Sequence, residues 1–362
     1  MKKKHKIIVL FLFVFMSLPA ISVCKYEIVS DSSKIYDITY QTAGTDGKQI
    51  NASGIIMVPA GEGPFPVLSC QHGTLFSRNV APTYFESCPE AQVLYELAVK
   101  SGYIVVMADY IGLGKEGKSP HPYFHAETEA TASRDMLIAS MDILKKKNVK
   151  YNGRLFLAGY SQGGHVTASL QRLLENSREI EFNITAAAIM AAPFDIHQLW
   201  LNHYDNPVAI SSAVTSLMVK TFYDIYGIGD LYSEFFKSPY DKLVPELLDY
   251  GHPEEEVINT LKAPPKDIFQ PEFVSSVKEG KHRFVEKLKE NEVYNWTPKS
   301  PTIIVCSMGD EVVNHSIDKN AFIKMKESGG NVKEIILGAN PDHANGFVPA
   351  LQEALKWFAS FK

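Results

Sequence analysis

The sequence has few cysteines and no excess of basic charge. Its 362 residues include four cysteines, and the formal net charge is −5 at pH 7. Four cysteines are too few for a fold held together by disulfides, and the absence of a basic stripe argues against nucleic acid as the main partner. The sequence has no H-E-x-x-H motif and no cysteine–histidine cluster, so we expect no metal.

The composition is that of a globular protein. Hydrophobic residues make up 45% of the chain and charged residues 21%, which excludes a disordered chain and allows a sizeable core. The length suits one large α/β domain or two smaller ones.

The first 22 residues have the features of a secretory signal peptide. Four lysines lie within residues 1–6, an apolar stretch runs from Ile7 to about Val23, and Ala20-Ile21-Ser22 fits the cleavage rule. We therefore expect an exported protein, either periplasmic, in the cell envelope or secreted. An uncleaved anchor and lipid attachment at Cys24 are the alternatives, and the second is disfavoured because Val23 is bulky.

Export leaves one question about the cysteines open. A bridge between Cys70 and Cys88 is permitted in an oxidising compartment, but the sequence fixes no geometry for it. Cys306 lies in the strand-like run Pro301–Met308 and is expected to be a buried apolar thiol.

Strand and helix signals alternate along the chain. A β-hairpin is predicted around Gly44–Gly47. Strand-like runs follow at 64–70, 102–110, 153–160, 185–194, 301–308 and 332–338, and helix-like runs at 127–147, 163–176, 319–328 and 348–361. Such alternation requires crossover connections, so it predicts an α/β fold with a mostly parallel sheet flanked by helices.

The segment 195–296 interrupts this alternation. Its patterns are helical, it contains no run typical of a buried strand, and aromatic residues are enriched in it. We expect an inserted helical cap over a pocket, with the α/β core formed by residues 23–194 and 297–362. The alternative for the aromatic residues is that they pack the core of the cap itself.

One serine lies in the pattern of a nucleophile elbow. Residues 157–166 read Leu-Ala-Gly-Tyr-Ser-Gln-Gly-Gly-His-Val, which contains G-x-S-x-G centred on Ser161. A strand-like run precedes the motif and a helix-like run follows it. Gly159 and Gly163 leave room where side chains would clash. An ordinary strand-to-helix turn is the alternative.

The serine needs a base and a group that orients the base. In this architecture the acid and then the histidine follow the serine along the chain. Asp310 and His343 each follow a strand-like run, where open α/β sheets place their sites. Asp342 is the rival acid, but the side chains of adjacent residues project in different directions, which favours Asp310. The remaining histidines fit this order less well, including those of segment 195–296.

An oxyanion hole needs two backbone N–H groups. The residue after the nucleophile, Gln162, is expected to supply one. The loop after the strand-like run 64–70 contains His72-Gly73, so Thr74 or Gly73 is expected to supply the other. A plain glycine turn is the alternative.

Together these motifs resemble the α/β-hydrolase superfamily over essentially the whole mature chain. The stretch from Met107 to Ala130, with Asp-Tyr-x-Gly-x-Gly and then His-Pro-Tyr before a helix, is similar to the secretory-lipase-like esterases of bacteria and fungi. The resemblance implies a carboxylic-ester hydrolase with a helical cap and no cofactor. Asn314 departs from the group, which often has proline there.

The sequence thus predicts an exported serine hydrolase acting on small-molecule or lipid esters. A serine peptidase of the same fold would use the same residues, and a catalytically silent binding protein is the third hypothesis. Covalent reaction at Ser161 would distinguish a peptidase from a silent binding protein. Comparing the hydrolysis of esters and amides would distinguish an esterase from a peptidase.

Overall fold

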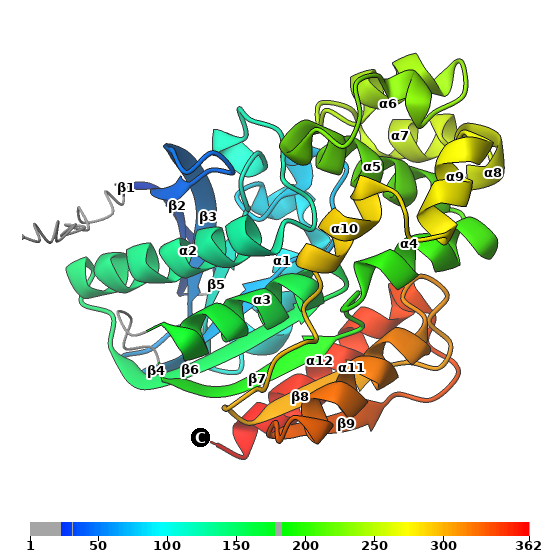
Figure 1. The fold of residues 1–362 in the computed structure, drawn as a ribbon. Helices are drawn as coiled ribbons and strands as arrows, with labels where there is room; N and C mark the ends of the chain where they lie inside the picture. Colours follow the sequence, from blue (N-terminus) through cyan, green and yellow to red (C-terminus); the bar gives the residue numbers. More distant parts are fainter. Residues whose placement is uncertain (1–22, 31, 178–182, 362) are drawn as a thin grey trace, which may run out of the picture.

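The computed structural model describes residues 23–30, 32–177 and 183–361, so the expected signal peptide, 1–22, lies outside the described residues. A nine-stranded sheet in the order β1-β2-β3-β5-β4-β6-β7-β8-β9 forms the centre of the fold (Figure 1). The strands are β1 (Val23–Ser30), β2 (Ser33–Ala43), β3 (Gln49–Val58), β4 (Phe65–Gln71), β5 (Ile104–Ala108), β6 (Tyr151–Tyr160), β7 (Ile184–Met190), β8 (Thr302–Cys306) and β9 (Val332–Ile336).

The sheet is mostly parallel, as the sequence predicts. The strands from β4 to β9 run parallel to their neighbours, whereas β1, β2 and β3 pair antiparallel with one another and β3 pairs antiparallel with β5. The predicted hairpin is the β2–β3 pair. All five residues of β5 and of β8 are buried, which is typical of parallel strands covered on both faces.

Helices cover both faces of the sheet. On one face lie α2 (Ala126–Lys146), α3 (Gln162–Asn176) and α11 (His315–Glu327). The other face is covered by α1 (Pro89–Leu94), the π-helical turn η3 (Tyr95–Val99) and α12 (His343–Ala359). Two apolar clusters result, one on each face. Because the crossover helices return the chain to the start of the next strand, the parallel strands all end at the same carboxyl edge of the sheet.

The chain between β7 and β8 folds into short helices. These are α4 (Ile196–Asp205), α5 (Ser211–Tyr226), α6 (Tyr240–Leu247), α7 (Glu254–Thr260), α8 (Pro265–Ile268), α9 (Pro271–Lys278) and α10 (Arg283–Glu290), and Figure 1 shows them gathered at one end of the sheet. Trp200 is fully buried and packs against Phe269, Phe273 and Phe284. The aromatic enrichment therefore builds the core of this segment, and the domain division 195–296 itself stays a prediction.

The described cysteine side chains are buried and unbridged. Cys70, Cys88 and Cys306 are free thiols, so the structure does not form the Cys70–Cys88 bridge that the sequence left open. Among the described residues, no helix combines the length and apolar character needed to cross a membrane.

Candidate active site

Ser161 occupies a strained turn between β6 and α3. Its backbone has φ 58° and ψ −125°, a left-handed conformation that costs a non-glycine residue on the order of 1–3 kcal/mol. The Ser161 N–H donates to the Met190 carbonyl at 3.0 Å, which ties the turn to the end of β7. The predicted strand–turn–helix geometry of a nucleophile elbow is therefore present.

Two glycines make this turn sterically feasible. A Cβ added at Gly159 would lie 2.1 Å from the Gly163 carbonyl oxygen, and one at Gly163 would lie 2.0 Å from the Gln71 carbonyl oxygen. Carbon atoms do not approach backbone oxygens so closely. The pattern Gly-x-Ser-x-Gly is thus required here by packing.

His343 and Asp310 lie in one line with the serine. His343 Nε2 is 2.9 Å from Ser161 Oγ, and His343 Nδ1 is 2.7 Å from Asp310 Oδ2. A carboxylate accepts only, so Nδ1–H donates to Asp310 and Nε2 is left to accept the serine proton. The Asp310 side chain is 1% exposed and the His343 side chain 14%. The three residues have the geometry of a Ser-His-Asp triad.

Asp342 is engaged elsewhere. It is the N-cap of α12, and its Oδ1 accepts from the backbone N–H and the side-chain amide of Asn345, both at 2.8 Å. Asp310, by contrast, uses Oδ1 to accept the N–H groups of Val312 and Val313, which fixes the carboxylate beneath the imidazole. Of the two acids, the structure brings Asp310 to His343.

Gln162 is held rigidly at the start of α3. Its backbone N–H belongs to the first helical turn, whose amides have no partner within the helix. Its side-chain Nε2 donates to His121 Nε2 at 3.0 Å and to Glu129 Oε1 at 2.8 Å. His121 can accept there because its Nδ1–H donates to the Ile111 carbonyl at 2.8 Å, and burial lowers its pKa to about 4. These bonds fix the Gln162 side chain, and its backbone N–H stays the predicted first oxyanion donor.

The two candidates for the second oxyanion donor differ. The Gly73 N–H donates to both carboxyl oxygens of Glu90 at 3.1 Å. In the part of the chain that the structure describes, the Thr74 N–H has no such partner. Thr74 is therefore the better candidate of the pair, and the Gly73 N–H instead anchors the loop.

Glu90 is a residue that the sequence analysis missed. A Cβ added at Gly73 would lie 2.9 Å from Glu90 Oε1 and 3.8 Å from Ser161 Cβ, so the carboxyl group and the nucleophile flank the same glycine. Burial raises the pKa of Glu90 to about 7, the Gly73 N–H opposes the rise, and the charge of Glu254 adds to it. No motif marks Glu90, because it reaches the site from α1.

The loop with Asp109 and Tyr110 supports the loop with His72. The Tyr110 ring stacks on His72 with centroids 4.1 Å apart, and the Tyr110 hydroxyl donates to the His72 carbonyl. Burial raises the pKa of Asp109 to about 6, and hydrogen bonds from Ser53 and Thr83 oppose the rise. The Asp-Tyr-x-Gly-x-Gly motif thus holds the loop that carries Thr74.

A buried ion pair lies below the elbow. His165 Nδ1 is 2.9 Å from Glu129 Oε2, and both side chains are fully buried. His165 Nε2 lies 2.8 Å from the Asn291 carbonyl. Both ring nitrogens of His165 therefore lie within hydrogen-bond distance of an oxygen atom. Asn291 also accepts from the Ala126 N–H at 2.9 Å, so the network links α2, α3 and the end of α10.

His203 of α4 lies within electrostatic range of the triad. Burial lowers its pKa to about 4; the charge of His343 lowers it further, whereas Asp310 acts in the opposite direction. Its Nδ1 contacts Ser211 Oγ at 2.7 Å. The sequence analysis assigned His203 to the helical segment only, because nothing local shows that α4 approaches the triad.

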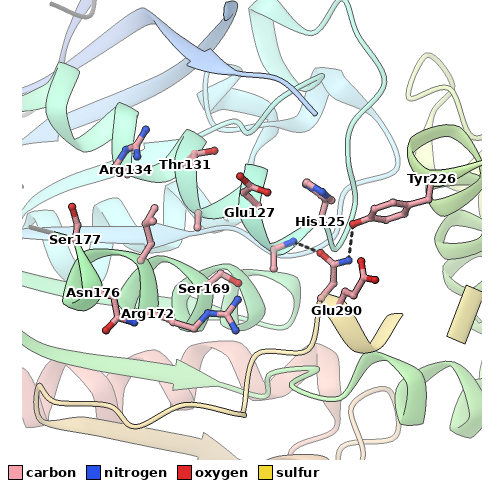
Figure 2. Close-up of a pocket in the computed structure, with 14 residues that line it drawn as sticks. His125, Glu127, Thr131, Arg134, Ser169, Arg172, Asn176, Ser177, Tyr226 and Glu290 are labelled. Atoms are coloured by element: carbon pink, nitrogen blue, oxygen red, sulfur yellow. Dashed lines mark hydrogen bonds between the residues drawn. The ribbon is translucent and has the colours of Figure 1, made fainter. Parts of the chain in front are cut away.

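The cavity drawn in Figure 2 is not the triad site. It has a volume of about 690 Å³ and lies beside α2 and α3, lined by His125, Arg134, Arg172, Asn291 and other residues but by none of the triad. Ser169 of α3 lines this cavity, and its hydroxyl donates to the His165 carbonyl. The hydrogen-bonded group of Ser161, His343 and Asp310 lies outside this cavity and defines the candidate active site.

The fold of the chain is shared by proteins of known structure. Neither protein-family models nor curated protein sequences match the chain. Solved structures do match. A predicted hydrolase from Legionella pneumophila has a TM-score of 0.87 and 29% identity over 92% of this chain and 90% of its own. The rice cell wall degrading esterase LipA from Xanthomonas oryzae has a TM-score of 0.82 and 25% identity over 93% of this chain and 95% of its own.

A more distant match shows the fold alone. Candida antarctica lipase A, in its closed state, has a TM-score of 0.74 at 16% identity, covering 94% of this chain and 80% of its own. The fold shared by these structures is that of the α/β-hydrolases, as the sequence motifs predict.

Replacement of the two acids distinguishes their roles. Asp310→Asn is expected to lower kcat by about 10³–10⁴, because an amide stabilises the wrong histidine tautomer. Asp342→Asn is expected to cost roughly tenfold or less, since asparagine is also a good N-cap. The measurement is kcat on one soluble short-chain ester, with circular dichroism to verify folding. A near-normal Asp310→Asn enzyme beside an inactive Asp342→Asn enzyme would reverse the assignment.

Two variants of Glu90 test whether its hydrogen bond to the Gly73 N–H positions the loop that carries Thr74. Glu90→Ala removes the acceptor of the Gly73 N–H and is expected to lower kcat about tenfold by loosening the neighbouring Thr74 donor. Glu90→Gln keeps an acceptor oxygen and is expected to stay within about threefold of the wild type. Equal losses in both variants would show that the hydrogen bond to Gly73 does not matter for the rate.

The Glu90 carboxyl group should make the free energy of unfolding depend on pH. Its pKa is raised from 4.5 to about 7, so over this range the folded protein keeps a proton that the unfolded chain has released. This contribution to stability is present at low pH and is lost as the pH rises through about 7. Relative to Glu90→Gln, the wild type should lose about 3 kcal/mol of unfolding free energy across this range, measured by urea unfolding at several pH values.

Proposed function

Since the chain is an α/β-hydrolase of the esterase- and lipase-like group, we propose that it hydrolyses carboxylic esters with Ser161 as nucleophile. The observation that carries this proposal is the hydrogen-bond chain from Ser161 Oγ through His343 to Asp310. The structural neighbour described as a cell wall degrading esterase supports an ester as the substrate class.

Acylation begins at the serine hydroxyl. Ser161 Oγ attacks the ester carbonyl while His343 Nε2 takes its proton, because that nitrogen is 2.9 Å away and Nδ1 is already committed to Asp310. Asp310 keeps the imidazole in this tautomer and stabilises the imidazolium that forms. The imidazolium then protonates the leaving alcohol, which leaves an acyl group on Ser161.

The negative charge of the tetrahedral intermediate falls on the former carbonyl oxygen. The N–H groups of Gln162 and Thr74 donate to it, and the N-terminus of α3 adds a favourable dipole. Water then enters, gives a proton to His343 and attacks the acyl carbon. Collapse of the second intermediate releases the acid and restores the Ser161 hydroxyl.

Segment 195–296 acts in this proposal as the cap over the substrate. The position of His203 near the triad and the bond from Val293 N–H to the Phe194 carbonyl support a cap that lies against the core. The cap then decides which acyl chains and alcohols enter, and the substrate is a small-molecule or lipid ester.

Loss of the nucleophile is the direct test. Ser161→Ala is expected to lower ester turnover at least about 10⁴-fold, because only binding and the oxyanion hole remain. It should also abolish labelling by a fluorophosphonate probe. Ser169→Ala is the matched control, since Ser169 lies in α3 and its hydroxyl donates to the His165 carbonyl. Turnover by Ser161→Ala within tenfold of the wild type would refute the assignment.

The substrate panel in this experiment runs over nitrophenyl esters from acetate to palmitate, with feruloyl and aminoacyl esters and a matched amide added. Faster hydrolysis of the ester than of its amide supports an esterase. Preference for the amide would support the peptidase alternative, and an inert Ser161 would support a binding protein.

We also propose that the protein is exported. The basic and apolar N-terminus and the small-residue pattern at Ala20-Ile21-Ser22 support this proposal. Cells that produce the full chain should yield an exported form that begins near Val23, as determined by terminal sequencing. An exported form that retains Met1 would support the anchor alternative.

A further inference from the structure

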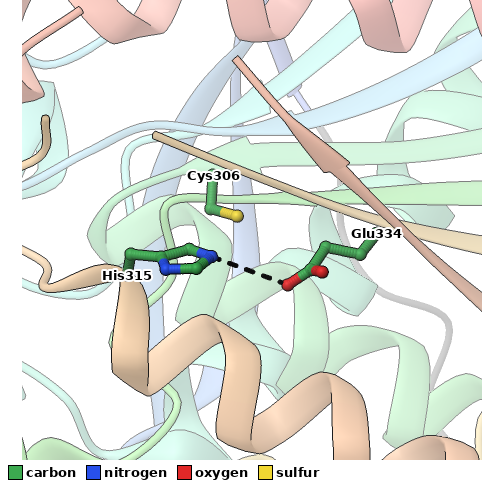
Figure 3. A group of neighbouring side chains, drawn as sticks. All are labelled: Cys306, His315 and Glu334. Atoms are coloured by element: carbon green, nitrogen blue, oxygen red, sulfur yellow. Dashed lines mark ion pairs between the residues drawn. The ribbon is translucent and has the colours of Figure 1, made fainter. Parts of the chain in front are cut away.

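Three side chains with metal-binding atoms meet beside the acid of the triad. Cys306 ends β8, His315 is the first residue of α11, and Glu334 lies in β9. Their sulfur, imidazole nitrogen and carboxylate oxygen all lie within 4.8 Å of one another. Figure 3 shows the three side chains converging from these separate elements.

The sheet register produces this convergence. Ile304 of β8 pairs with Glu334 of β9, and Cys306 projects to the same face as Ile304 because side chains alternate along a strand. Helix α11 packs on that face, where Ile304 contacts the cluster that contains Ile317. The first turn of α11 therefore brings His315 over the two strand residues.

Two polar atoms of the group lack hydrogen-bond partners. Within the described part of the chain, His315 Nε2 and Glu334 Oε1 are buried without any such partner. They face each other at 3.8 Å, which is the distance of an ion-pair contact (Figure 3) but is too long for a hydrogen bond. Cys306 is 1% exposed and makes only a 3.8 Å contact with the Ile335 carbonyl. Such atoms are costly when they stay unsatisfied.

We propose that Cys306, His315 and Glu334 bind one divalent transition-metal ion of the Zn²⁺ type. A thiolate, an imidazole and a carboxylate are ligands that Zn²⁺ accepts together, whereas Mg²⁺ and Ca²⁺ prefer oxygen ligands alone. Metal–ligand bonds of about 2.0–2.3 Å in tetrahedral geometry separate ligand atoms by about 3.3–3.6 Å. The observed spacing reaches this with small side-chain movements.

The surroundings favour a cation. Asp318 lies three residues after His315 on the same face of α11, is 1% exposed, and has an Oδ2 atom without a partner among the described residues. On binding, the Cys306 thiol forms a bond from sulfur to the metal and releases its proton to water, while His315 binds through the Nε2 lone pair. Solvent completes the coordination.

The position of the site indicates a structural role. Cys306 and His315 bracket the loop 307–314, which carries Asp310, and Glu334 ties that loop to β9. A metal held by these residues clamps the base of the acid loop without touching Ser161. The inference does not depend on ester hydrolysis, so failure of one leaves the other standing.

Cobalt supplies a spectroscopic test, because Co²⁺ bound by a thiolate gives a sulfur-to-metal charge-transfer absorption. The full chain, freed of metal with a chelator, is titrated with Co²⁺ and then with Zn²⁺. We expect one equivalent of Co²⁺ to produce the absorption and Zn²⁺ to displace it. An excess of Zn²⁺ about one hundred times its dissociation constant should raise Tm by about 5 °C.

Substitutions then identify the ligands. Cys306→Ser should abolish the charge-transfer absorption, and His315→Gln and Glu334→Gln should each weaken Zn²⁺ binding at least about tenfold. Cys88→Ser is the matched control, because Cys88 is also a buried free thiol but lies outside the group. His343→Ala tests binding at the triad histidine. Both controls should keep the absorption.

Three results would overturn the proposal. The first is the absence of Co²⁺ absorption and of Zn²⁺ binding in the folded wild type. The second is a signal that survives Cys306→Ser, and the third is one that disappears in His343→Ala. Circular dichroism of each variant verifies folding, and a variant that fails to fold is replaced by Cys306→Ala or His315→Asn.

Discussion

The left-handed backbone of Ser161 is the constraint on which the rest of the site depends. With φ at 58°, Ser161 is the single residue between the end of β6 and the start of α3, so its side chain lies at the N-terminus of the helix. This turn requires Gly159 and Gly163, and Gly163 packs against the backbone of Gln71 at the end of β4. This contact places the loop after β4 beside Ser161.

A strained turn has to be held by its surroundings, and here a buried polar network does so. Glu129 binds the Gln162 side chain with one oxygen and His165 with the other, so a single carboxylate fixes two residues of the elbow helix. The network extends through Asn291 to the end of α10. The members of such a network support one another, so the network couples the order of the elbow to the position of the helical segment.

The parts of the site that the sequence predicts are those with a local pattern. Ser161, Asp310 and His343 each follow a strand-like run. Parallel strands bring their carboxyl ends to one edge of the sheet, so the proximity of these residues could be predicted although they are distant in the sequence. Glu90 and His203 could not be found this way, because a carboxyl group on α1 and an imidazole on α4 reach the site through packing between distant helices. Helix α12 begins at His343, five residues before the predicted run, since the cap formed by Asp342 outweighs the break suggested by Pro349.

The loop 307–314, which carries Asp310, is supported by different elements from those that support Ser161. Ser161 lies between buried central strands, whereas Asp310 follows β8, whose outer neighbour β9 is the edge of the sheet and is partly exposed. Local hydrogen bonds from Val312 and Val313 orient the carboxylate, but they do not anchor the loop to the edge strand. The loop is instead anchored to the chain that follows β9, where the Met308 N–H donates to the Gly338 carbonyl and Ser307 Oγ donates to the Pro341 carbonyl. The convergence of Cys306, His315 and Glu334 lies at the same junction of β8, α11 and β9. The position of Asp310 relative to His343 thus depends on how firmly the edge of the sheet is joined to its centre.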